Sequence, residues 1–216
     1  MKLPPFVYVI GLSFIVSLWM LFKVKPLPVY LKLFPPFLLA TLLAELLGPY
    51  LTLIGVHNAP LYNFFSTFEF CFYLLIVSLI IKTAIVSKII RIVIILYAIT
   101  AVVNILFIQG MRTFHTVTYS LGCLLVVGFC MYYFFELFRL PKSVKLINNP
   151  AFWICSGLLF FYCCSFPLYG LIHFWMTIKI IVKNFASIVT ILNIFLYSLF
   201  TIAFLCSRIR KYTLSP

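Results

Sequence analysis

The stretch LYNFFSTFEFCFYLL, Leu61–Leu75, is apolar enough to lie in a bilayer, yet it carries Glu69 at its centre. The chain has three acidic residues, all Glu, and the other two, Glu45 and Glu136, also lie in long apolar runs. A helix needs about 20 predominantly apolar residues to span the hydrocarbon core of a membrane. The number of such runs therefore decides the fold, and the carboxyl groups inside them raise the question of function.

The composition excludes a soluble domain. Of the 216 residues, 65% are hydrophobic and only 9% are charged, whereas about a quarter of the residues of a soluble domain are charged. The chain is therefore predicted to be a polytopic membrane protein, with the lipid bilayer as its first partner. A net charge of +13 would suggest nucleic acid in a soluble chain. Here Lys and Arg stand between the apolar runs, so they are interpreted as loop anchors, and no nucleic-acid partner is predicted.

The apolar runs predict an all-α fold, a single domain of residues 1–216 that forms a bundle of seven transmembrane helices. The predicted helices cover about 4–22, 34–54, 61–81, 89–108, 114–138, 151–175 and 184–207. Prolines and charges in KVKPLP, residues 23–28, and in LPKSVKLINNP, residues 140–150, interrupt the helices. The short polar turn GVHNAP, residues 55–60, makes a hairpin of the second and third helices.

The distribution of basic residues predicts the orientation in the membrane. Twelve Lys and Arg fall on one side of the predicted bundle: Lys23, Lys25, Lys32, Lys82, Lys88, Arg91, Arg139, Lys142, Lys145, Arg208, Arg210 and Lys211. The other side has four, which are Lys2, Arg112, Lys179 and Lys183. Because the positively charged side stays in the cytoplasm, the N-terminus is predicted to lie outside and the C-terminus in the cytoplasm.

Polar residues recur at helical spacing, which predicts polar stripes that face the bundle interior because lipid offers them no partner. On the third predicted helix the stripe is Tyr62, Ser66, Glu69 and Tyr73, and on the second it is Thr41, Glu45, Gly48 and Thr52. At 1.5 Å per residue, Glu45 and Glu69 both lie roughly 12–14 Å below the outer surface. The candidate ligand- or proton-binding residues are Glu45, Glu69, Tyr62, Ser66, Tyr73, Asn104, Tyr162, Tyr169, His173 and Asn193.

An ionised carboxyl at mid-bilayer costs about 2.5–3.5 kcal/mol on insertion scales, so an intramembrane Glu is a functional hypothesis by default. Two carboxyls close together would form a proton site or a receptor for a cation or amine. The alternative is structural: a protonated Glu hydrogen-bonded to Tyr or Asn across helices. Glu136 is interpreted as structural, because Arg139 three residues later is in reach for an ion pair.

The three His residues, His57, His115 and His173, are all predicted near the outer end of the bundle. Together with the two Glu they suggest zinc as an alternative, because imidazole and carboxylate are zinc ligands. No HExxH or HxxxH spacing supports it. The seven Cys lack the spacing of a disulfide framework or a zinc ribbon. No metal and no cofactor is therefore predicted.

The segments LYNFFSTFEFCFY, residues 61–73, and NPAFWICSGLLFFYCCSFPLYG, residues 149–170, resemble small uncharacterised seven-helix proteins of the bacterial inner membrane. That resemblance implies a bacterial inner-membrane location and no particular chemistry. The topology is also similar to that of SWEET-like sugar transporters, with echoes between Asn63–Ser66 and Asn184–Ser187. The Pro-Gln motif expected of those transporters is absent.

Three functions remain open. The first is sensing of a small molecule or of pH in an outward-facing polar pocket, with the signal passed to a cytoplasmic or membrane partner protein that contacts the basic inner loops. The second is transport of a small solute, coupled to protons through Glu45 and Glu69. The third is an intramembrane hydrolase with a Glu and His metal centre. The sequence favours sensing, because the inner half offers few polar side chains for a transport path, and it favours a non-enzymatic role.

Overall fold

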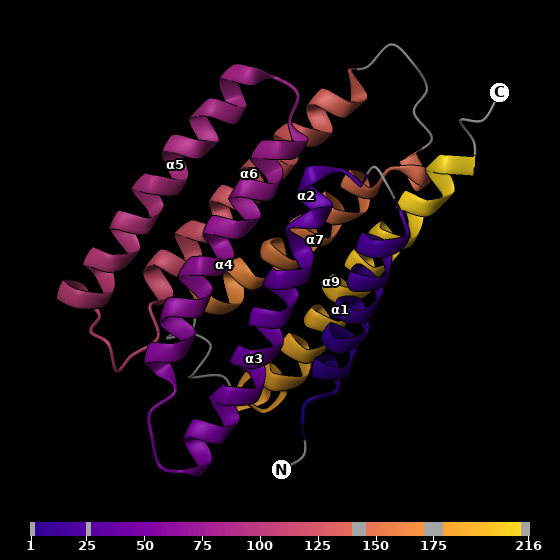
Figure 1. Ribbon diagram of the computed structural model, residues 1–216. Helices are drawn as coiled ribbons and strands as arrows, with labels where there is room; N and C mark the ends of the chain where they lie inside the picture. Colours follow the sequence, from indigo (N-terminus) through magenta and orange to yellow (C-terminus); the bar gives the residue numbers. More distant parts are fainter. Residues whose placement is uncertain (1–2, 25–26, 140–145, 171–178, 213–216) are drawn as a thin grey trace.

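The computed structural model describes residues 3–24, 27–139, 146–170 and 179–212, with side chains up to Cys206 and, in the last helix, from Asn184 onward. The described part of the chain is helical and contains no strand. Its elements are α1 (Pro5–Lys23), α2 (Val29–Lys32), α3 (Phe34–Leu53), α4 (Ala59–Ile80), α5 (Ala84–Val103), the π-helix η1 (Asn104–Ile108), α6 (Thr116–Phe138), the 3-10 helix η2 (Leu146–Asn148), α7 (Pro150–Gly170) and α9 (Lys179–Tyr212) (Figure 1).

Seven helical stretches among the described residues are long and apolar enough to cross a membrane, which confirms the predicted number of spans. Residues 171–175 of the sixth predicted span lie outside the described residues. The clearest difference lies in the fourth span, which begins at Ala84 rather than near residue 89. The sequence suggested a later start because Lys82, Lys88 and Arg91 interrupt the apolar run. The helix begins earlier because a carboxylate of α6, described below, accepts hydrogen bonds from the backbone just before it.

Proline and glycine set several of the helix ends. Proline occupies the first turn of α1, α3 and α4, where its missing N–H removes no helical hydrogen bond. At the end of α3, Gly55 has a φ of 77°, and the N–H of Val56 donates to the carbonyl oxygen of Leu51 at 2.9 Å. This is a Schellman ending, in which glycine takes the left-handed conformation and turns the chain sharply. The chain then reverses into α4 within five residues, 54–58.

Six helices surround the core of the bundle. The series α1, α3, α4, α6, α7 and α9 closes on itself, because each of these helices packs against the next and α9 packs against α1. Helix α5 stands outside this ring, chiefly against α4, and forms one edge of the molecule in Figure 1. The first described residues and the turn between α3 and α4 lie at the lower end in this view, and the C-terminal end of α9 lies at the upper end.

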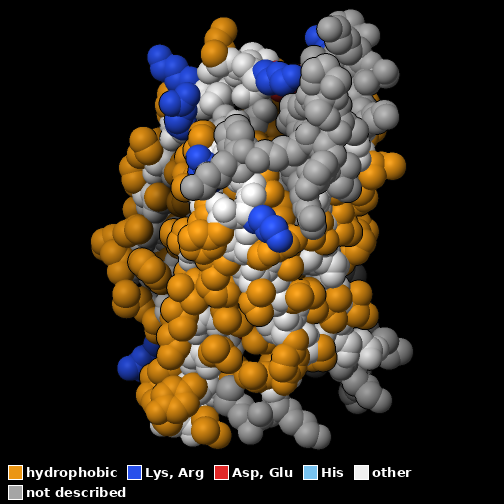
Figure 2. All heavy atoms as spheres, turned by 45° about the vertical axis from the view of Figure 1, so that its right-hand side comes forward, with side chains coloured by type: hydrophobic (Ala, Val, Ile, Leu, Met, Phe, Trp, Pro, Cys, Tyr) orange, Lys and Arg blue, Asp and Glu red, His pale blue; other side chains and the backbone are white. Residues whose placement is uncertain are grey.

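The outer surface suits a lipid environment. Figure 2 shows hydrophobic side chains over most of the visible flank, with most of the visible Lys and Arg in its upper part. Large apolar side chains are exposed along the helices, among them Tyr8, Ile15, Phe64, Ile95 and Phe135. A surface this apolar would be a liability in water, and it is the expected surface of a protein that is solvated by acyl chains.

Candidate functional site

A cavity of about 350 Å³ opens among the helices at the end of the bundle that carries residues 54–58. We call it the carboxyl cavity. Side chains from α1, α3, α4, α6, α7 and α9 contribute to it, with Asn58 and Phe114 from the connecting segments. It is lined by Phe6, Glu45, Asn58, Ala59, Tyr62, Phe65, Ser66, Glu69, Phe114, Tyr119, Phe161, Ser165, Tyr169, Val189, Leu192, Asn193 and Tyr197.

The structure places most of the candidate residues in or beside this cavity. Those that line it are Glu45, Tyr62, Ser66, Glu69, Tyr169 and Asn193. Tyr73 and Tyr162 are fully buried next to it. Asn104 does not line it and belongs to a separate polar cluster, and His173 lies outside the described residues.

The two carboxyl groups enter the cavity from different helices, Glu45 from α3 and Glu69 from α4. They are close enough to interact electrostatically. The hydroxyl groups of Tyr73 and Tyr162 lie beside the Glu69 carboxyl, but the contacts fall short of a hydrogen bond, and neither hydroxyl has a partner among the described residues. Because both tyrosines are fully buried, the polar groups around Glu69 are left with unused hydrogen-bonding capacity.

Local sequence explains how α3 approaches α4 at Glu45. Gly48 lies one turn beyond Glu45, and a Cβ atom there would lie only 2.6 Å from Cζ of Tyr62. Glycine is therefore required for the Tyr62 ring to pack over α3. Pro49 follows inside the helix, and it has no N–H to donate to the carbonyl oxygen of Glu45 four residues earlier. Glu45 thus carries an acceptor on its backbone that the helix itself does not satisfy.

Aromatic rings form one wall of the cavity. The ring of Tyr169, from α7, lies 4.5 Å from that of Tyr119, from α6. Phe114 contacts both, with centroids 5.3 Å from Tyr119 and 5.6 Å from Tyr169. We call these three residues the ring wall. Offset and tilted ring packing at these distances is favourable and stiff, so the wall has a fixed shape that faces the carboxyl groups.

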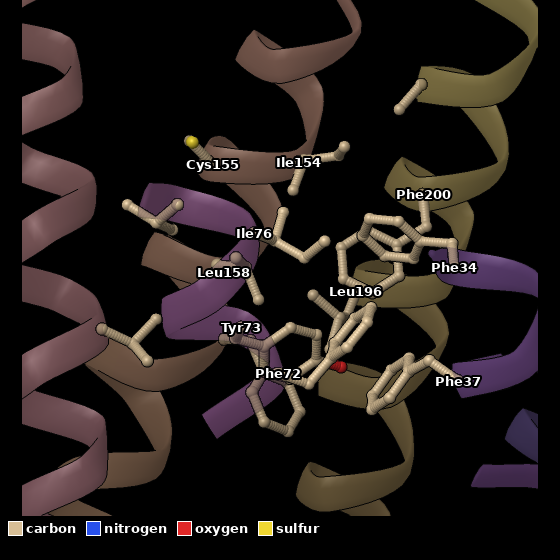
Figure 3. Close-up of a cluster of buried hydrophobic side chains, with 14 of the residues drawn as sticks. Phe34, Phe37, Phe72, Tyr73, Ile76, Ile154, Cys155, Leu158, Leu196 and Phe200 are labelled. Carbon is tan, nitrogen blue, oxygen red and sulfur yellow. The ribbon is translucent and has the colours of Figure 1, made fainter. Parts of the chain in front are cut away.

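A second group of rings lies deeper in the bundle than the carboxyl groups. Phe37 of α3 stacks on Phe72 of α4 with centroids 3.9 Å apart, and Phe34 lies 5.1 Å from Phe200 of α9. Figure 3 shows these four side chains with Tyr73 in one cluster between the helices. Along their helices, Phe34 and Phe37 lie further from the turn at residues 54–58 than Glu45 does, and Phe72 lies further from it than Glu69 does. On α9, Phe200 lies further from that end of the bundle than Tyr197 does. We call this cluster the aromatic floor, because it lies deeper in the bundle than the carboxyl groups.

The separate polar cluster lies between α4, η1 and α6, and His115 is its centre. The Nε2 atom of His115 is 2.6 Å from Oγ of Ser66, and Nδ1 is 2.5 Å from Oγ1 of Thr118. Thr118 in turn accepts a hydrogen bond from Nδ2 of Asn104 at 3.2 Å. Asn63 fixes the preceding loop, since its Oδ1 accepts from the N–H of His115 at 3.1 Å. Ser66 lines the carboxyl cavity, so the two polar regions meet at that residue.

The hydrogen bonds indicate which nitrogen of His115 carries the proton. The hydroxyl of Ser66 donates to the carbonyl oxygen of Tyr62 at 2.6 Å, so it accepts from Nε2 of His115. Nδ1 is then the acceptor for Thr118. This arrangement holds a neutral imidazole, and burial of the side chain lowers the pKa of His115 from its ordinary value of 6.5 to about 4. No side chain with a formal charge contributes to that shift.

Asn104 was expected to line the pocket, but it is not among the described residues that line the carboxyl cavity. It begins η1, where the N–H of Gln109 donates to the carbonyl oxygen of Asn104 at 2.8 Å. Its side chain donates to Oε1 of Gln109 at 2.7 Å. Tyr97 and Asn104 are both buried on one face of α5 and η1, as their helical spacing predicts. Helix α5 stands outside the ring of helices, so Asn104 meets Thr118 of α6 instead of the cavity.

Among the described residues, no group of three His, Cys or acidic side chains is placed to hold a metal ion. His57 is exposed in the turn between α3 and α4, and His115 is engaged in the cluster just described. Zinc hydrolysis therefore has no ligand set in the described part of the chain.

Glu136 has a different role from the expected ion pair with Arg139. Its two carboxylate oxygens accept hydrogen bonds from the N–H of Lys82 at 3.0 Å and from that of Thr83 at 2.8 Å. The Thr83 hydroxyl also donates to it at 2.7 Å. Arg139 lies instead over the ring of Phe135, 4.5 Å from its centroid. Glu136 thus caps the start of α5 from a neighbouring helix, since helix N-termini attract negative charge.

Several lining residues were not among the candidates. The polar or aromatic ones are Phe6, Asn58, Phe65, Phe114, Tyr119, Phe161, Ser165 and Tyr197. Two of them carried a usable signal: Tyr197 lies four residues after Asn193, and Ser165 lies three after Tyr162 and four before Tyr169, so each shares a helix face with a candidate. Tyr119 and the phenylalanines carried none, because aromatic residues occur on every face of these helices.

Comparison of the chain with protein-family models, with curated proteins and with solved structures finds no match.

Proposed function

We propose that this protein is a membrane receptor that binds a small molecule in the carboxyl cavity and passes the signal to a partner protein. The observation that carries the proposal is that Glu45 and Glu69 line one cavity although they belong to different helices. Carboxyl groups within membrane spans are costly and are retained mostly where they bind or move something. The cavity volume of about 350 Å³ lies at the lower end of the range typical of small-molecule pockets.

The proposed orientation follows from the positively charged side of the sequence, which would put the cavity mouth on the outer face of a bacterial inner membrane. The partner would then contact the basic cytoplasmic end, near Lys82, Lys88 and Arg139. We propose no catalytic role. The Ser66 hydroxyl lies against His115 but donates to the carbonyl oxygen of Tyr62, and the described residues include no metal-ligand set.

Transport of a small solute is the second candidate, and one observation favours it. Ser13, midway along α1, is fully buried, and its hydroxyl has no hydrogen-bond partner among the described residues. A solute that passes along this helix would supply a hydrogen-bond partner for that hydroxyl. Such a path would have to open the aromatic floor, where rings from three helices are in direct contact, and for this reason we prefer a receptor.

A thermal-shift screen of the purified protein against amines, sugars, lipid headgroup compounds and metal salts tests the proposal. Val189 lines the cavity, so Val189→Phe fills part of it and should abolish stabilisation by any hit. Ile191 is 65% exposed on the same helix, so Ile191→Phe is a matched control that should respond like the wild type. Hits that stabilise both variants equally would show that they bind elsewhere and would contradict the proposal.

Two further measurements separate receptor from transporter. A receptor should show no saturable uptake of the hit into proteoliposomes, and binding should change hydrogen exchange at the opposite end of the bundle. The amides of Lys82 and Thr83, held there by Glu136, are suitable reporters. Saturable uptake that Glu69→Gln abolishes would establish the transporter instead.

A further inference from the structure

Among the described residues, the charged side chains that line the carboxyl cavity are all acidic. Its described lining includes two carboxyl groups and no Lys, Arg or His side chain. Across the described residues no basic group is near enough to form a salt bridge with either carboxyl, because the lining otherwise consists of aromatic, aliphatic, hydroxyl and amide groups. A buried carboxylate is stable only when something compensates its charge, so a ligand that suits this cavity brings positive charge with it.

The aromatic lining of the cavity favours an organic cation over a metal ion. Rings make up much of the lining, including Tyr62, Phe65, Tyr197 and the three residues of the ring wall. The face of an aromatic ring attracts an organic cation and accommodates its hydrocarbon body. A hard metal ion instead needs six or more oxygen ligands for calcium or a near-octahedral set for magnesium. The described lining has hydroxyl and amide oxygens, but they are spread over several helices, and no group of three His, Cys or acidic side chains among the described residues is placed to hold a metal ion.

The positions of the carboxyl groups and of the aromatic rings define how a ligand would lie in the cavity. Glu69 belongs to the turn of α4 just above the aromatic floor, and Tyr73 and Tyr162 place unpartnered hydroxyls beside it. The ring wall starts at Phe114, in the segment that precedes α6 at the cavity end of the bundle. A cationic head group therefore fits at the deep end and an apolar body fits toward the mouth.

We propose that the carboxyl cavity binds a small organic ammonium ion, with the ammonium group held by Glu45 and Glu69 and the apolar body packed against the ring wall. This inference rests on the proposed function and names its ligand class. The ammonium group can belong to a soluble amine or to the headgroup of a membrane lipid, and the two sources share this chemistry.

Four probes with the same ring and different charge test the inference in the detergent-purified protein. Benzylamine and benzyltrimethylammonium carry a cation, benzyl alcohol is neutral, and benzoate is an anion. We expect both cations to bind saturably, by calorimetry or by thermal shift, at least about tenfold more tightly than the alcohol. Loss of one partner from a close charge pair commonly weakens binding by 10-fold or more, so Glu45→Gln and Glu69→Gln should each reduce the affinity for the cations by about that factor.

The control variant is Glu136→Gln, which makes the same chemical change at a carboxylate outside the cavity. It should bind the cations with the affinity of the wild type. Because Glu and Gln have nearly the same shape, Glu45→Gln and Glu69→Gln should stay folded. A cooperative thermal transition in each variant would verify that it is folded. Tyr169→Leu serves as a second variant that keeps both carboxyls and removes part of the ring wall. It should weaken benzyltrimethylammonium, and it should change the affinity for the smaller tetramethylammonium less.

The outcomes separate the ligand class from the function. If benzyl alcohol or benzoate binds as tightly as the cations, and Val189→Phe abolishes that binding, the ammonium assignment is overturned and the receptor proposal stands. If neither cation binds saturably at millimolar concentration, the ammonium assignment is overturned, and the broader screen decides the receptor proposal by itself.

Nanodiscs distinguish the two sources of the ammonium group. Benzylamine binding is compared in nanodiscs of phosphatidylglycerol alone and in nanodiscs that also contain phosphatidylethanolamine. Competition by phosphatidylethanolamine supports the ammonium assignment with a lipid as its source. Equal affinity in both membranes supports it with a soluble amine as the source.

Discussion

Ser66 of α4 and His115, the residue before α6, are joined by a hydrogen bond of 2.6 Å between Oγ and Nε2. Ser66 lines the carboxyl cavity, whereas His115 is completely buried in the neighbouring polar cluster. This one contact therefore links the carboxyl cavity to the segment that leads into α6. The stability of that segment and the behaviour of the cavity should depend on each other through it.

His115 should make the protein less stable in acid. Its pKa is lowered from 6.5 to about 4 by burial, so between these pH values the unfolded chain binds more protons than the folded one. The contribution of His115 is complete above pH 6.5 and is lost as pH falls toward 4, amounting to roughly 3 kcal/mol of unfolding free energy at the lower limit. Ser66, Thr118 and Phe114 surround the ring, and none of them titrates in this range.

The measurement is the melting temperature of the wild type and of His115→Gln between pH 7 and pH 4. The difference between the two proteins isolates the histidine from other titrating groups, and it should shrink as pH falls. His57→Gln is the matched control, because His57 is exposed, and its pH profile should follow that of the wild type. A difference between wild type and His115→Gln that stays constant across this range would refute a buried neutral imidazole.

Ser66 and His115 should be energetically coupled. Ser66→Ala leaves the Nε2–H of His115 buried without an acceptor, which costs about 1–3 kcal/mol. In a double-mutant cycle with His115→Gln, the two losses should fail to add by about 0.5–3 kcal/mol. Thr67 is the control on the same helix, since its hydroxyl donates to Asn63 within α4 at 2.8 Å, and Thr67→Ala should add to His115→Gln. Additive losses for Ser66→Ala would mean that the hydrogen bond contributes nothing.

Gly48→Ala should displace Tyr62. The new Cβ atom would lie 2.6 Å from Cζ of the Tyr62 ring, and overpacking of this kind costs typically about 1–3 kcal/mol. Gly11→Ala and Gly128→Ala are the controls, because a Cβ at either position meets nothing within 4 Å. They should leave the melting temperature unchanged or raise it. The double variant Gly48→Ala, Tyr62→Leu should recover most of the lost stability, and failure to do so would place the strain elsewhere.

Glu136→Ala should loosen the start of α5. It removes the acceptor of the Lys82 and Thr83 amides, and loss of a helix cap costs about 1 kcal/mol, with a range of 0.5–2 kcal/mol. Hydrogen exchange should accelerate at those two amides and in the first turn of α5. Arg139→Ala provides the comparison, and it should leave the exchange of both amides as it is because its side chain lies over Phe135. If hydrogen exchange accelerates equally in the two variants, the result would support the Glu136–Arg139 ion pair that the sequence suggested.

The approach of Glu45 to Glu69 was predictable in part. The stripes of α3 and α4 follow from helical periodicity, which is a local property, and the short turn at Gly55 fixes both helices at the same end. The cavity between them was not predictable from the sequence. It depends on how far α3 and α4 diverge and on which side chains of α6, α7 and α9 fill the space. Asn104 illustrates the limit: its spacing from Tyr97 matched a buried face, but only the packing of the helices shows that α5 stands outside the ring around the cavity.

The sequence by itself determined the seven apolar helices, their ends at Pro and Gly, and the presence of carboxyl groups inside them. Length, hydropathy and backbone stereochemistry are properties of neighbouring residues, so a single chain reveals them. Only the tertiary structure decided that Glu45 and Glu69 share a cavity, that Glu136 caps α5, and that His115 lies against Ser66. These relationships join residues of different helices, and in a membrane, where apolar faces are equally compatible with lipid and with protein, they are set by the packing of side chains rather than by the hydropathy of any one helix.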